Sequence, residues 1–313
     1  MIFNGRLNRF AQCGALVLLS SGAFSGSARA VEMTMMLYSL GSGALGAGQT
    51  APDGFYFSTI GVYNQWRASK DVPFGGLTLK ANVSMPVMLG SMMFVVPDKI
   101  LGGRLSVTAT GGVGNIAIDA GLQAANIGKS TQGWGGTDSS VKVSLGWDVA
   151  PSFSHKVSVT TFLPTGRYDK GFHPNVGLNR FGADLSWGAT YLNPKVGFEV
   201  SGSVGYTLEG YNGLTAYRSG NAVHFEEGIA QHFGNGFRIG VLSYQYTQTS
   251  ADGGAGANLG PLRTRVVGVG ASLGYTTVLG GRLVVFSAQA TRDVATADRM
   301  RGTGGVIATT VKF

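Results

Sequence analysis

Four histidines, His155, His173, His224 and His232, are the side chains best suited to metal binding or acid–base chemistry. They are scattered along the chain and lack the paired spacing of a helix-borne zinc site. In an extended strand every second residue shares a face, so His224, Glu226 and His232 would lie on one side. A metal or catalytic cluster there is one reading, and a polar patch lining an interior is the simpler one. We therefore predict no metal site.

Two further patterns resemble catalytic motifs. Gly270-Ala-Ser-Leu-Gly274 matches the nucleophile elbow of hydrolases, but that motif requires a strand-to-helix turn. Here the apolar residues alternate without a break, which predicts a continuous strand and an inward hydroxyl at Ser272. Asp184 and Glu199 could form the carboxylate pair of a glycoside hydrolase, although nothing else in the chain indicates a sugar site. We predict that the protein is not an enzyme and has no catalytic residues.

A glycine pattern, Gly41-x-Gly43-x-x-Gly46, matches the dinucleotide-binding fingerprint. That fingerprint needs a preceding strand and a following helix, and neither is predicted here. The stretch is better read as part of a flexible segment. We predict no cofactor.

The elements that position these side chains are strands. Residues 181–191 and 196–206 alternate strictly between apolar and polar or small residues, and Asn193-Pro194-Lys195 lies between them. Period two predicts strands, and the short turn predicts a hairpin. Each run has about 11 residues, the length with which a tilted strand crosses a bilayer.

Composition extends this reading to the whole chain. The 313 residues include 51 glycines, only 13% are charged, and no apolar run in the body reaches the roughly 18 residues of a spanning helix. Short turns alternate with long polar connections, as in bacterial barrels. The sequence predicts an all-β fold: a single antiparallel transmembrane β-barrel of about 12 strands. A soluble β-sandwich is the alternative, but it would not give every strong strand a polar face.

The chain divides into three parts. Residues 1–30 resemble a signal peptide, with Arg6 and Arg9, an apolar stretch containing Cys13, and a cleavage site ending at Ala30. Residues 31–53 form a flexible segment lying either in the periplasm or in the barrel lumen, and residues 54–313 form the barrel. The basic residues do not cluster, so we predict no binding of nucleic acid.

Alternation also assigns faces to individual residues. Side chains of predicted inward parity, which we take as candidates for the lumen lining, are Lys80, Arg104, Lys142, Asp148, Lys156, Asp184, Glu199, His224, Glu226 and Arg238. In the strand at 77–89, Val83 and its apolar neighbours of the same parity would face lipid, and Pro86 predicts a bulge. Residues 119–137 read as a long connection. Glu227 would face lipid, so we expect a bulge or a position at the rim.

Several ordered motifs resemble the meta-pathway phenol-degradation family of outer-membrane proteins. They are Pro164-Thr-Gly-Arg-Tyr-Asp169, Asn175-Val-Gly-Leu-Asn179, Thr190-Tyr-Leu192, Thr215-Ala-Tyr-Arg-Ser-Gly220, His224-Phe-Glu226 and Tyr244-Gln-Tyr-Thr-Gln248. The last strand ends on Phe313, which resembles the signal that outer-membrane assembly machinery reads. The resemblance implies an outer-membrane location and the movement of hydrophobic or aromatic compounds.

These observations together predict a passive channel or uptake protein for small, hydrophobic or aromatic molecules. Its partners would be outer-membrane lipid, the assembly machinery and a small permeant. The alternative is a barrel that does not transport and serves a structural or surface-interaction role, its lumen closed by residues before Asp53. An outer-membrane hydrolase is a third reading, and it would require a compact catalytic cluster.

Overall fold

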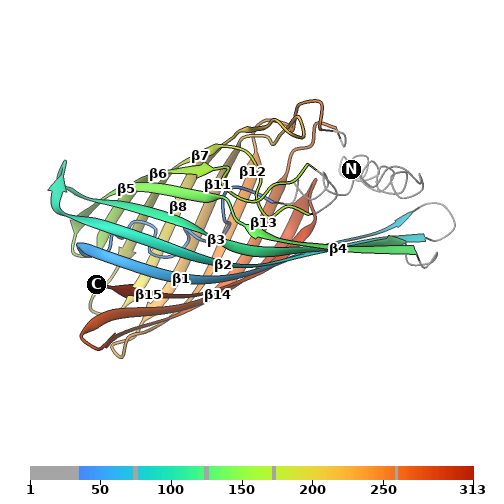
Figure 1. Ribbon diagram of the computed structural model, residues 1–313. Helices are drawn as coiled ribbons and strands as arrows, with labels where there is room; N and C mark the ends of the chain where they lie inside the picture. The colour runs from blue at the N-terminus through green and yellow to red at the C-terminus, as the bar shows by residue number, and fades with distance from the viewer. Residues whose placement is uncertain (1–34, 73–76, 123–126, 171–173, 258–259) are drawn as a thin grey trace.

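The computed structural model describes residues 35–72, 77–122, 127–170, 174–257 and 260–313, and it shows a closed antiparallel β-barrel of 12 strands (Figure 1). The barrel strands are β1 (Gly54–Val72), β2 (Leu77–Ile100), β3 (Gly103–Leu122), β5 (Ser139–Ala150), β6 (Phe153–Leu163), β7 (Gly182–Leu192), β8 (Phe198–Glu209), β11 (Ala222–His232), β12 (Phe237–Gln248), β13 (Arg265–Leu279), β14 (Arg282–Ala297) and β15 (Arg301–Lys312). The predicted fold class and strand number are confirmed. None of the described residues form a helix long and apolar enough to cross a membrane.

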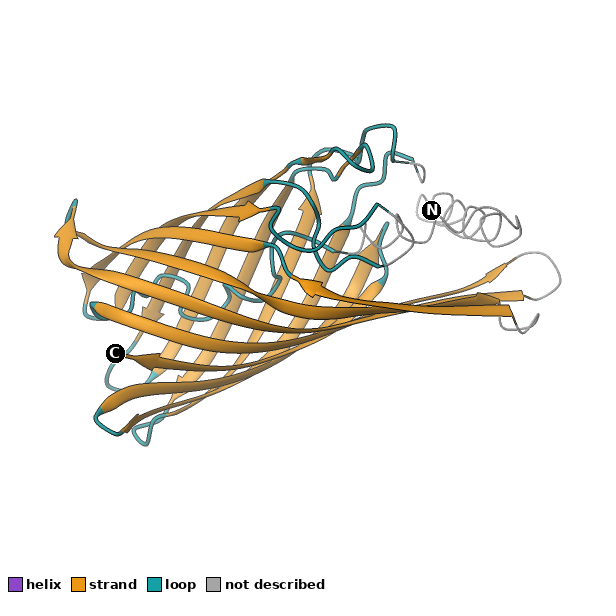
Figure 2. Ribbon diagram, in the orientation of Figure 1, coloured by secondary structure: helices purple, strands orange, loops and turns teal. Residues whose placement is uncertain are grey.

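The barrel closes because β1 pairs with both β2 and β15, and β2 pairs in turn with β3. Closure leaves no open sheet edge within the cylinder, so the strands satisfy one another's backbone groups. Long connections (164–181, 210–221 and 249–264) lie at one end, which we call the loop end. Short turns (151–152, 193–197, 233–236 and 280–281) lie at the other, the turn end (Figure 2).

Alternation places apolar side chains outside and polar side chains inside in the hairpin of β7 and β8. Trp187 and Phe198 are 46% and 41% exposed, whereas Asp184 and Glu199 are 1% and 0% exposed. This contrast excludes a β-sandwich, because a sandwich would bury the two aromatic rings between its sheets. The exposed aromatic face is the one that meets lipid.

In β2 the predicted faces are reversed. Met88, Met92 and Phe94 are exposed, and Val83 is buried inside the barrel. The register between β1 and β2 is unbroken from Gly54↔Val95 to Val72↔Leu77, so the same parity holds along the strand. The prediction failed because β2 carries apolar residues on both faces, and alternation of hydropathy then does not identify the inner one.

Neither predicted bulge is present. At Pro86, pairing with β3 stops after Ser84↔Ala117 and resumes at Val87↔Gly114 in the same register, because proline has no N–H to donate. Glu227 lies at the centre of β11, in unbroken register with β8 and β12. Its carboxylate is exposed on the outer face and accepts a 2.7 Å hydrogen bond from Ser243 Oγ.

The predicted connection over 119–137 is instead largely strand. The chain continues β3 to Leu122, and β4 (Ile127–Gly136) returns along it. β4 pairs with the part of β3 from Val113 to Leu122, and β5 pairs with the part from Arg104 to Thr110. The ends of β1, β2 and β3 that lie away from the turn end form a narrow sheet together with β4. We call this sheet the arm, and it projects beyond the loop end (Figures 1 and 2). Glycine and serine content had suggested a loop where backbone pairing forms a strand.

Candidate functional site

Residues 35–53, which we call the lumenal segment, run through the interior of the barrel. At the loop end, Arg180 Nη2 donates to Met35 O at 3.5 Å. Further along, Lys156 Nζ donates to Gln49 O at 2.8 Å, and Gly54 then begins β1 at the turn end. The segment therefore crosses the lumen from one end to the other. Of the two predicted locations for these residues, the structure shows the lumenal one, and residues 31–34 lie outside the described part.

The glycine pattern of the lumenal segment binds carboxylates of the barrel wall. The amides of Gly41 and Gly43 donate to the two oxygens of Glu226, and Gly46 N donates to Glu199 Oε1 at 2.7 Å. Gly41 and Gly46 have φ values of 86° and 62°, a region that favours glycine. The motif that resembles a dinucleotide fingerprint thus forms an amide nest for side-chain carboxylates.

Part of the lumenal segment touches the wall too closely to accept a side chain. Gly48 N donates to Thr190 Oγ1 at 2.9 Å. A Cβ on Gly48 would lie 2.3 Å from Ser154 O, and a Cβ on Gly188 would lie 2.5 Å from Ala47 O. Glycine on both surfaces allows the backbone of the segment to rest directly on β6 and β7.

Beside the segment lies a buried polar group centred on His224. His224 Nε2 lies 2.8 Å from Asp184 Oδ2, which also accepts a 2.8 Å hydrogen bond from Thr207 Oγ1. The ring of Tyr38, from the lumenal segment, stacks on the imidazole with centroids 3.7 Å apart. The Asp184–His224 contact joins β7 to β11 within the wall, and the Tyr38 ring of the segment packs on it, so this buried group holds the segment in place.

The second predicted carboxylate is separated from the first. Glu199 pairs with His232 and accepts a 2.6 Å hydrogen bond from Ser201 Oγ, whereas Asp184 pairs with His224. The two acids therefore belong to different hydrogen-bonded groups, which does not support a glycosidase pair. Ser272 lies inward within β13, without the strand-to-helix turn that the nucleophile elbow requires. No group of three metal-ligating side chains occurs among the described residues.

The candidate lumen residues fall into three places. Inward positions along the middle of the barrel hold Lys142, Lys156, Asp184, Glu199, His224 and Glu226. Arg104 and Asp148 form an ion pair of 3.1 Å at the turn end, and Arg238 also has inward parity there. The predicted inward position of Lys80 was wrong, because Lys80 shares the outward parity of Met88 and lies on the arm. Of the remaining histidines, His155 lies outward against Trp147, and His173 lies outside the described residues.

Apolar residues line another part of the lumen, which the alternation argument missed. Met35 of the lumenal segment packs in one buried cluster whose other members are Trp66, Val83, Ile116, Ile118, Val176, Leu178 and Met300. A second cluster contains Ala44, Ala222, Leu242, Tyr244, Tyr246 and Val266. Strands β1 to β3 and β11 to β13 thus supply apolar and aromatic groups, whereas β5 to β8 supply most of the charged ones. The sequence signal was the apolar content of both faces of β2 and β12.

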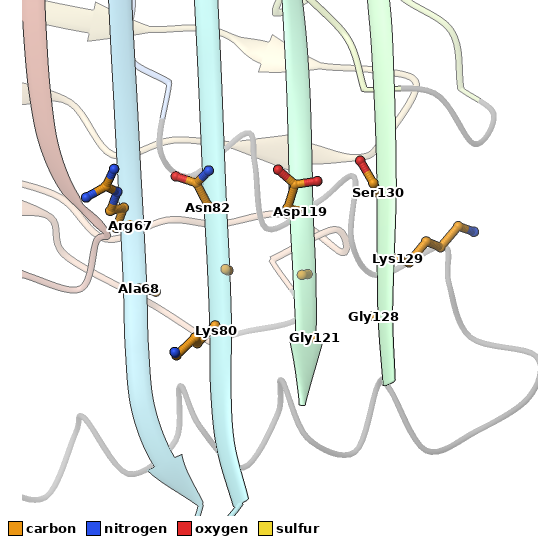
Figure 3. A pocket seen from close by; sticks show the side chains of 11 residues that line it. Arg67, Ala68, Lys80, Asn82, Asp119, Gly121, Gly128, Lys129 and Ser130 are labelled. Carbon is orange, nitrogen blue, oxygen red and sulfur yellow. The ribbon is translucent and has the colours of Figure 1, made fainter. Parts of the chain in front are cut away.

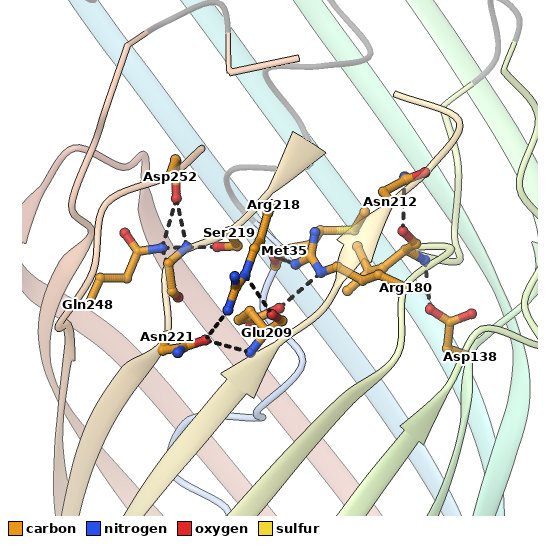
Figure 4. Close-up of polar contacts among 12 residues, drawn as sticks. Met35, Asp138, Arg180, Glu209, Asn212, Arg218, Ser219, Asn221, Gln248 and Asp252 are labelled. Atoms are coloured by element: carbon orange, nitrogen blue, oxygen red, sulfur yellow. Dashed lines mark hydrogen bonds and ion pairs between the residues drawn. The ribbon is translucent and has the colours of Figure 1, made fainter. Parts of the chain in front are cut away.

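Polar contacts order the loop end around the entry of the lumenal segment (Figure 4). Arg180 Nε and Glu209 Oε2 form a fully buried ion pair of 2.9 Å. Asp252 accepts hydrogen bonds of 3.0 Å from both Gly220 N and Gln248 Nε2. Burial raises the pKa of the Asp252 carboxyl above its usual range. These contacts tie three long connections together, so the mouth of the barrel is an ordered structure.

Lys142→Glu is expected to increase the preference of the lumen for cations several-fold, because it exchanges a positive for a negative charge on the inner face of β5. The zero-current potential of single channels under a KCl gradient measures this preference. Lys195→Glu makes the same charge change in an exposed turn outside the barrel and is the control. An unchanged potential in Lys142→Glu, from a conducting channel, would remove Lys142 from the ion path.

Comparison with known proteins places the chain in a family. The sequence profile of the family described as "Putative MetA-pathway of phenol degradation" matches residues 22–308. The chain belongs to this family. The motifs that carried the resemblance in the sequence lie between residues 164 and 248, inside the matched region of the phenol-degradation family.

One solved structure with a TM-score above 0.5 shares the fold of this family member at low sequence identity, and two others give lower scores. The COG4313 outer membrane channel from Pseudomonas putida F1 has a TM-score of 0.63 and 13% identity, over 86% of this chain and 98% of that chain. The CymD monoaromatic hydrocarbon channel has a TM-score of 0.43 and 10% identity, over 84% and 89%. The transport unit of the autotransporter AIDA-I from Escherichia coli has a TM-score of 0.48 and 9% identity, over 98% and 99%. No curated protein sequence matches the chain significantly.

Proposed function

We propose that this protein is a passive channel of the bacterial outer membrane that admits small hydrophobic or aromatic compounds. The observation that carries the proposal is the apolar and aromatic lining of the interior, in which one cluster contains Met35 and Trp66 and a second contains Tyr244 with Met36 packed against it. A lumen that passes only ions or sugars would not require an apolar lining. Membership of the phenol-degradation family agrees with it.

The arrangement suggests how such a molecule would pass. Connections 164–181 and 210–221 form the mouth, and the apolar lining lies beneath them. Met35 and Met36 border that lining, and methionine side chains adapt readily to different ligand shapes. The lumenal segment packs into both apolar clusters through Met35 and Ala44, so passage requires the compound to displace these contacts. During export, residues 1–30 would be removed by cleavage near Ala30, and Phe313 would then guide assembly of the barrel in the outer membrane.

Phenol is expected to reduce the ion current through the protein in planar bilayers, because its ring would occupy the apolar lining and obstruct the lumen. A hydrophilic solute of similar size is expected to leave the current unchanged. Val83→Thr keeps the side-chain shape but adds a hydroxyl to the lining, so block should weaken several-fold. The measurement is the concentration of phenol that halves the current.

Val113→Thr is the matched control for this experiment, since Val113 lies outward on β3 and is 55% exposed. If phenol and the hydrophilic solute reduce the current equally, phenol does not bind selectively in the lumen. If Val83→Thr and Val113→Thr change the block by phenol equally, the apolar lining is not where phenol binds. That result would reject the proposed permeant class without bearing on the fold.

A second function is favoured by the lumenal segment itself. A barrel whose interior is occupied from end to end could serve as a structural or surface-interaction protein and conduct nothing. Bilayer recordings separate the two, because a plug that never moves gives no current, whereas a mobile one gives measurable openings.

A further inference from the structure

The outer face of the barrel carries a group of arginines near the loop end. Arg67 in β1 lies directly opposite Arg301 in β15, and Arg292 in β14 lies opposite Thr303, two residues from Arg301. All three arginines are exposed. Side chains directly opposite on antiparallel strands are about 5 Å apart at Cβ, and diagonal neighbours about 7–8 Å apart. The three guanidinium groups therefore share one small patch, which we call the arginine patch.

The arginine patch lies near the loop-end border of the apolar outer band, with exposed Val294 just beyond Arg292 on β14. Toward the turn end, the same faces of β1, β15 and β14 carry Tyr63, Ile307 and Phe286, which are 49%, 67% and 39% exposed. The outward apolar band of a membrane barrel is about 25 Å tall and ends at the lipid headgroups. The arginines therefore lie at headgroup level on the side of the long loops.

Nothing in the described part of the chain neutralises the arginine patch. Neither Arg67, Arg292 nor Arg301 forms an ion pair there, and the hydrogen bond found for Arg67 goes from Nη2 to the neutral Gln65 Oε1 at 2.8 Å. The nearest carboxylate along β14, Asp293, is buried and accepts hydrogen bonds from Tyr244 and Gly302. Like charges placed opposite one another destabilise a strand pair, so the patch favours an external anion.

Neutral and charged polar groups continue the same row onto the arm. Asn82, Asp119 and Ser130 follow Arg67 across β2, β3 and β4 in register, and Figure 3 shows the four side chains in line. They border a shallow hollow of about 650 Å³, which Lys80 also lines. Amide, carboxylate and hydroxyl groups in a row match the hydroxyls of a sugar, whereas the guanidinium groups match phosphate.

We propose that this face binds the phosphorylated glycolipid of the outer leaflet, lipopolysaccharide, through its lipid A phosphates and sugars. Arg67 and Arg301 would hold one phosphate between them, and Arg292 would contact it from the diagonal position. The acyl chains would lie along the apolar band below, against residues such as Tyr63 and Ile307. This proposal rests on the outer-membrane location proposed above, but not on transport.

Native mass spectrometry of the full-length protein in detergent micelles tests the proposal with three probes: lipid A bearing two phosphates, lipid A bearing one, and the dephosphorylated lipid. Wild-type protein should bind the first most tightly and the last most weakly. Arg67→Gln/Arg301→Gln should weaken binding of the first probe at least ten-fold. Lys99→Gln/Lys195→Gln removes the same charge from the turn end, where both lysines are exposed, and should change binding less than two-fold.

Two results would overturn the proposal. The first is an equal loss in both double variants, or no dependence on phosphate, because binding would then follow net charge or the acyl chains alone. The second is a dimer of wild-type protein that only the arginine variant loses, which would assign the face to a second copy of the chain. Resistance of the folded barrel to SDS at room temperature confirms that each variant is folded. Ion conductance of the same samples reports separately on the channel.

Discussion

Gly48→Ala is expected to raise the mean single-channel conductance several-fold. The added Cβ would lie 2.3 Å from Ser154 O and 2.7 Å from Thr190 N, both backbone atoms of the barrel wall. The hydrogen-bonded strands cannot move away, so the lumenal segment must leave this contact. Its hydrogen bond from Gly48 N to Thr190 Oγ1 is lost at the same time. Planar-bilayer recording of the purified variant measures the change.

Gly213→Ala provides the matched control, because a Cβ at Gly213 meets nothing within 4 Å. It makes the same chemical change in a loop and should leave conductance at the wild-type value. If Gly48→Ala conducts no better than Gly213→Ala, then the lumenal segment does not limit the current. The barrel would in that case be closed elsewhere, and the structural role would become the better hypothesis.

The fold was predictable because the strand periodicity depends on neighbours along the chain. In β7 and β8, each apolar residue is two positions from the next, and this alone separates Trp187 and Phe198 outside from Asp184 and Glu199 inside. The strand number followed from a count of the alternating runs, and the alternation of short turns and long connections indicated a barrel. Both patterns can be read from residues close together in the sequence, so they do not require knowledge of which strands pair.

Failures arose where the face of a residue depends on distant parts of the chain. Val83 is inside because the lumenal segment and β3 provide an apolar surface for it there, and no residue near it in sequence indicates this. Lys80 then lies outside by the same parity. Glu227 lies on a regular strand paired on both sides, and Ser243, sixteen positions away, donates to its carboxylate. Pairing across such separations is invisible to hydropathy alone.

The candidate site was predictable in its members but not in its organisation. Asp184, His224 and Glu226 were assigned inward by parity, and the structure places them there. Tyr38 and the amides of Gly41 and Gly43, which complete the site, come from a segment without any period. Glycine spacing was the available signal, because a backbone that must touch a wall at several points needs residues without side chains.

Glu209→Gln is expected to lower the free energy of unfolding by about 3–5 kcal/mol, because it removes the carboxylate charge from a fully buried ion pair with Arg180. The side chains of Arg180 and Glu209 are 0% and 1% exposed. The measurement is reversible urea unfolding in lipid vesicles. Asp169→Asn makes the same carboxylate-to-amide change in the pair with Arg167, whose side chains are 57% and 51% exposed. Exposed pairs contribute only about 0–1 kcal/mol, so this control should remain close to the wild type.

Removing both charges distinguishes the loss of charge balance in the buried pair from lost packing as the cause of the destabilisation. In Arg180→Met/Glu209→Gln no charge remains buried, so the double variant should be more stable than Glu209→Gln alone. If the double variant is instead less stable by the sum of the two single effects, the pair acts mainly through its contacts with Met35 and the loops. The Arg180 side chain would then stabilise the mouth by filling space and donating hydrogen bonds, because Arg180 Nη2 also donates to Met35 O.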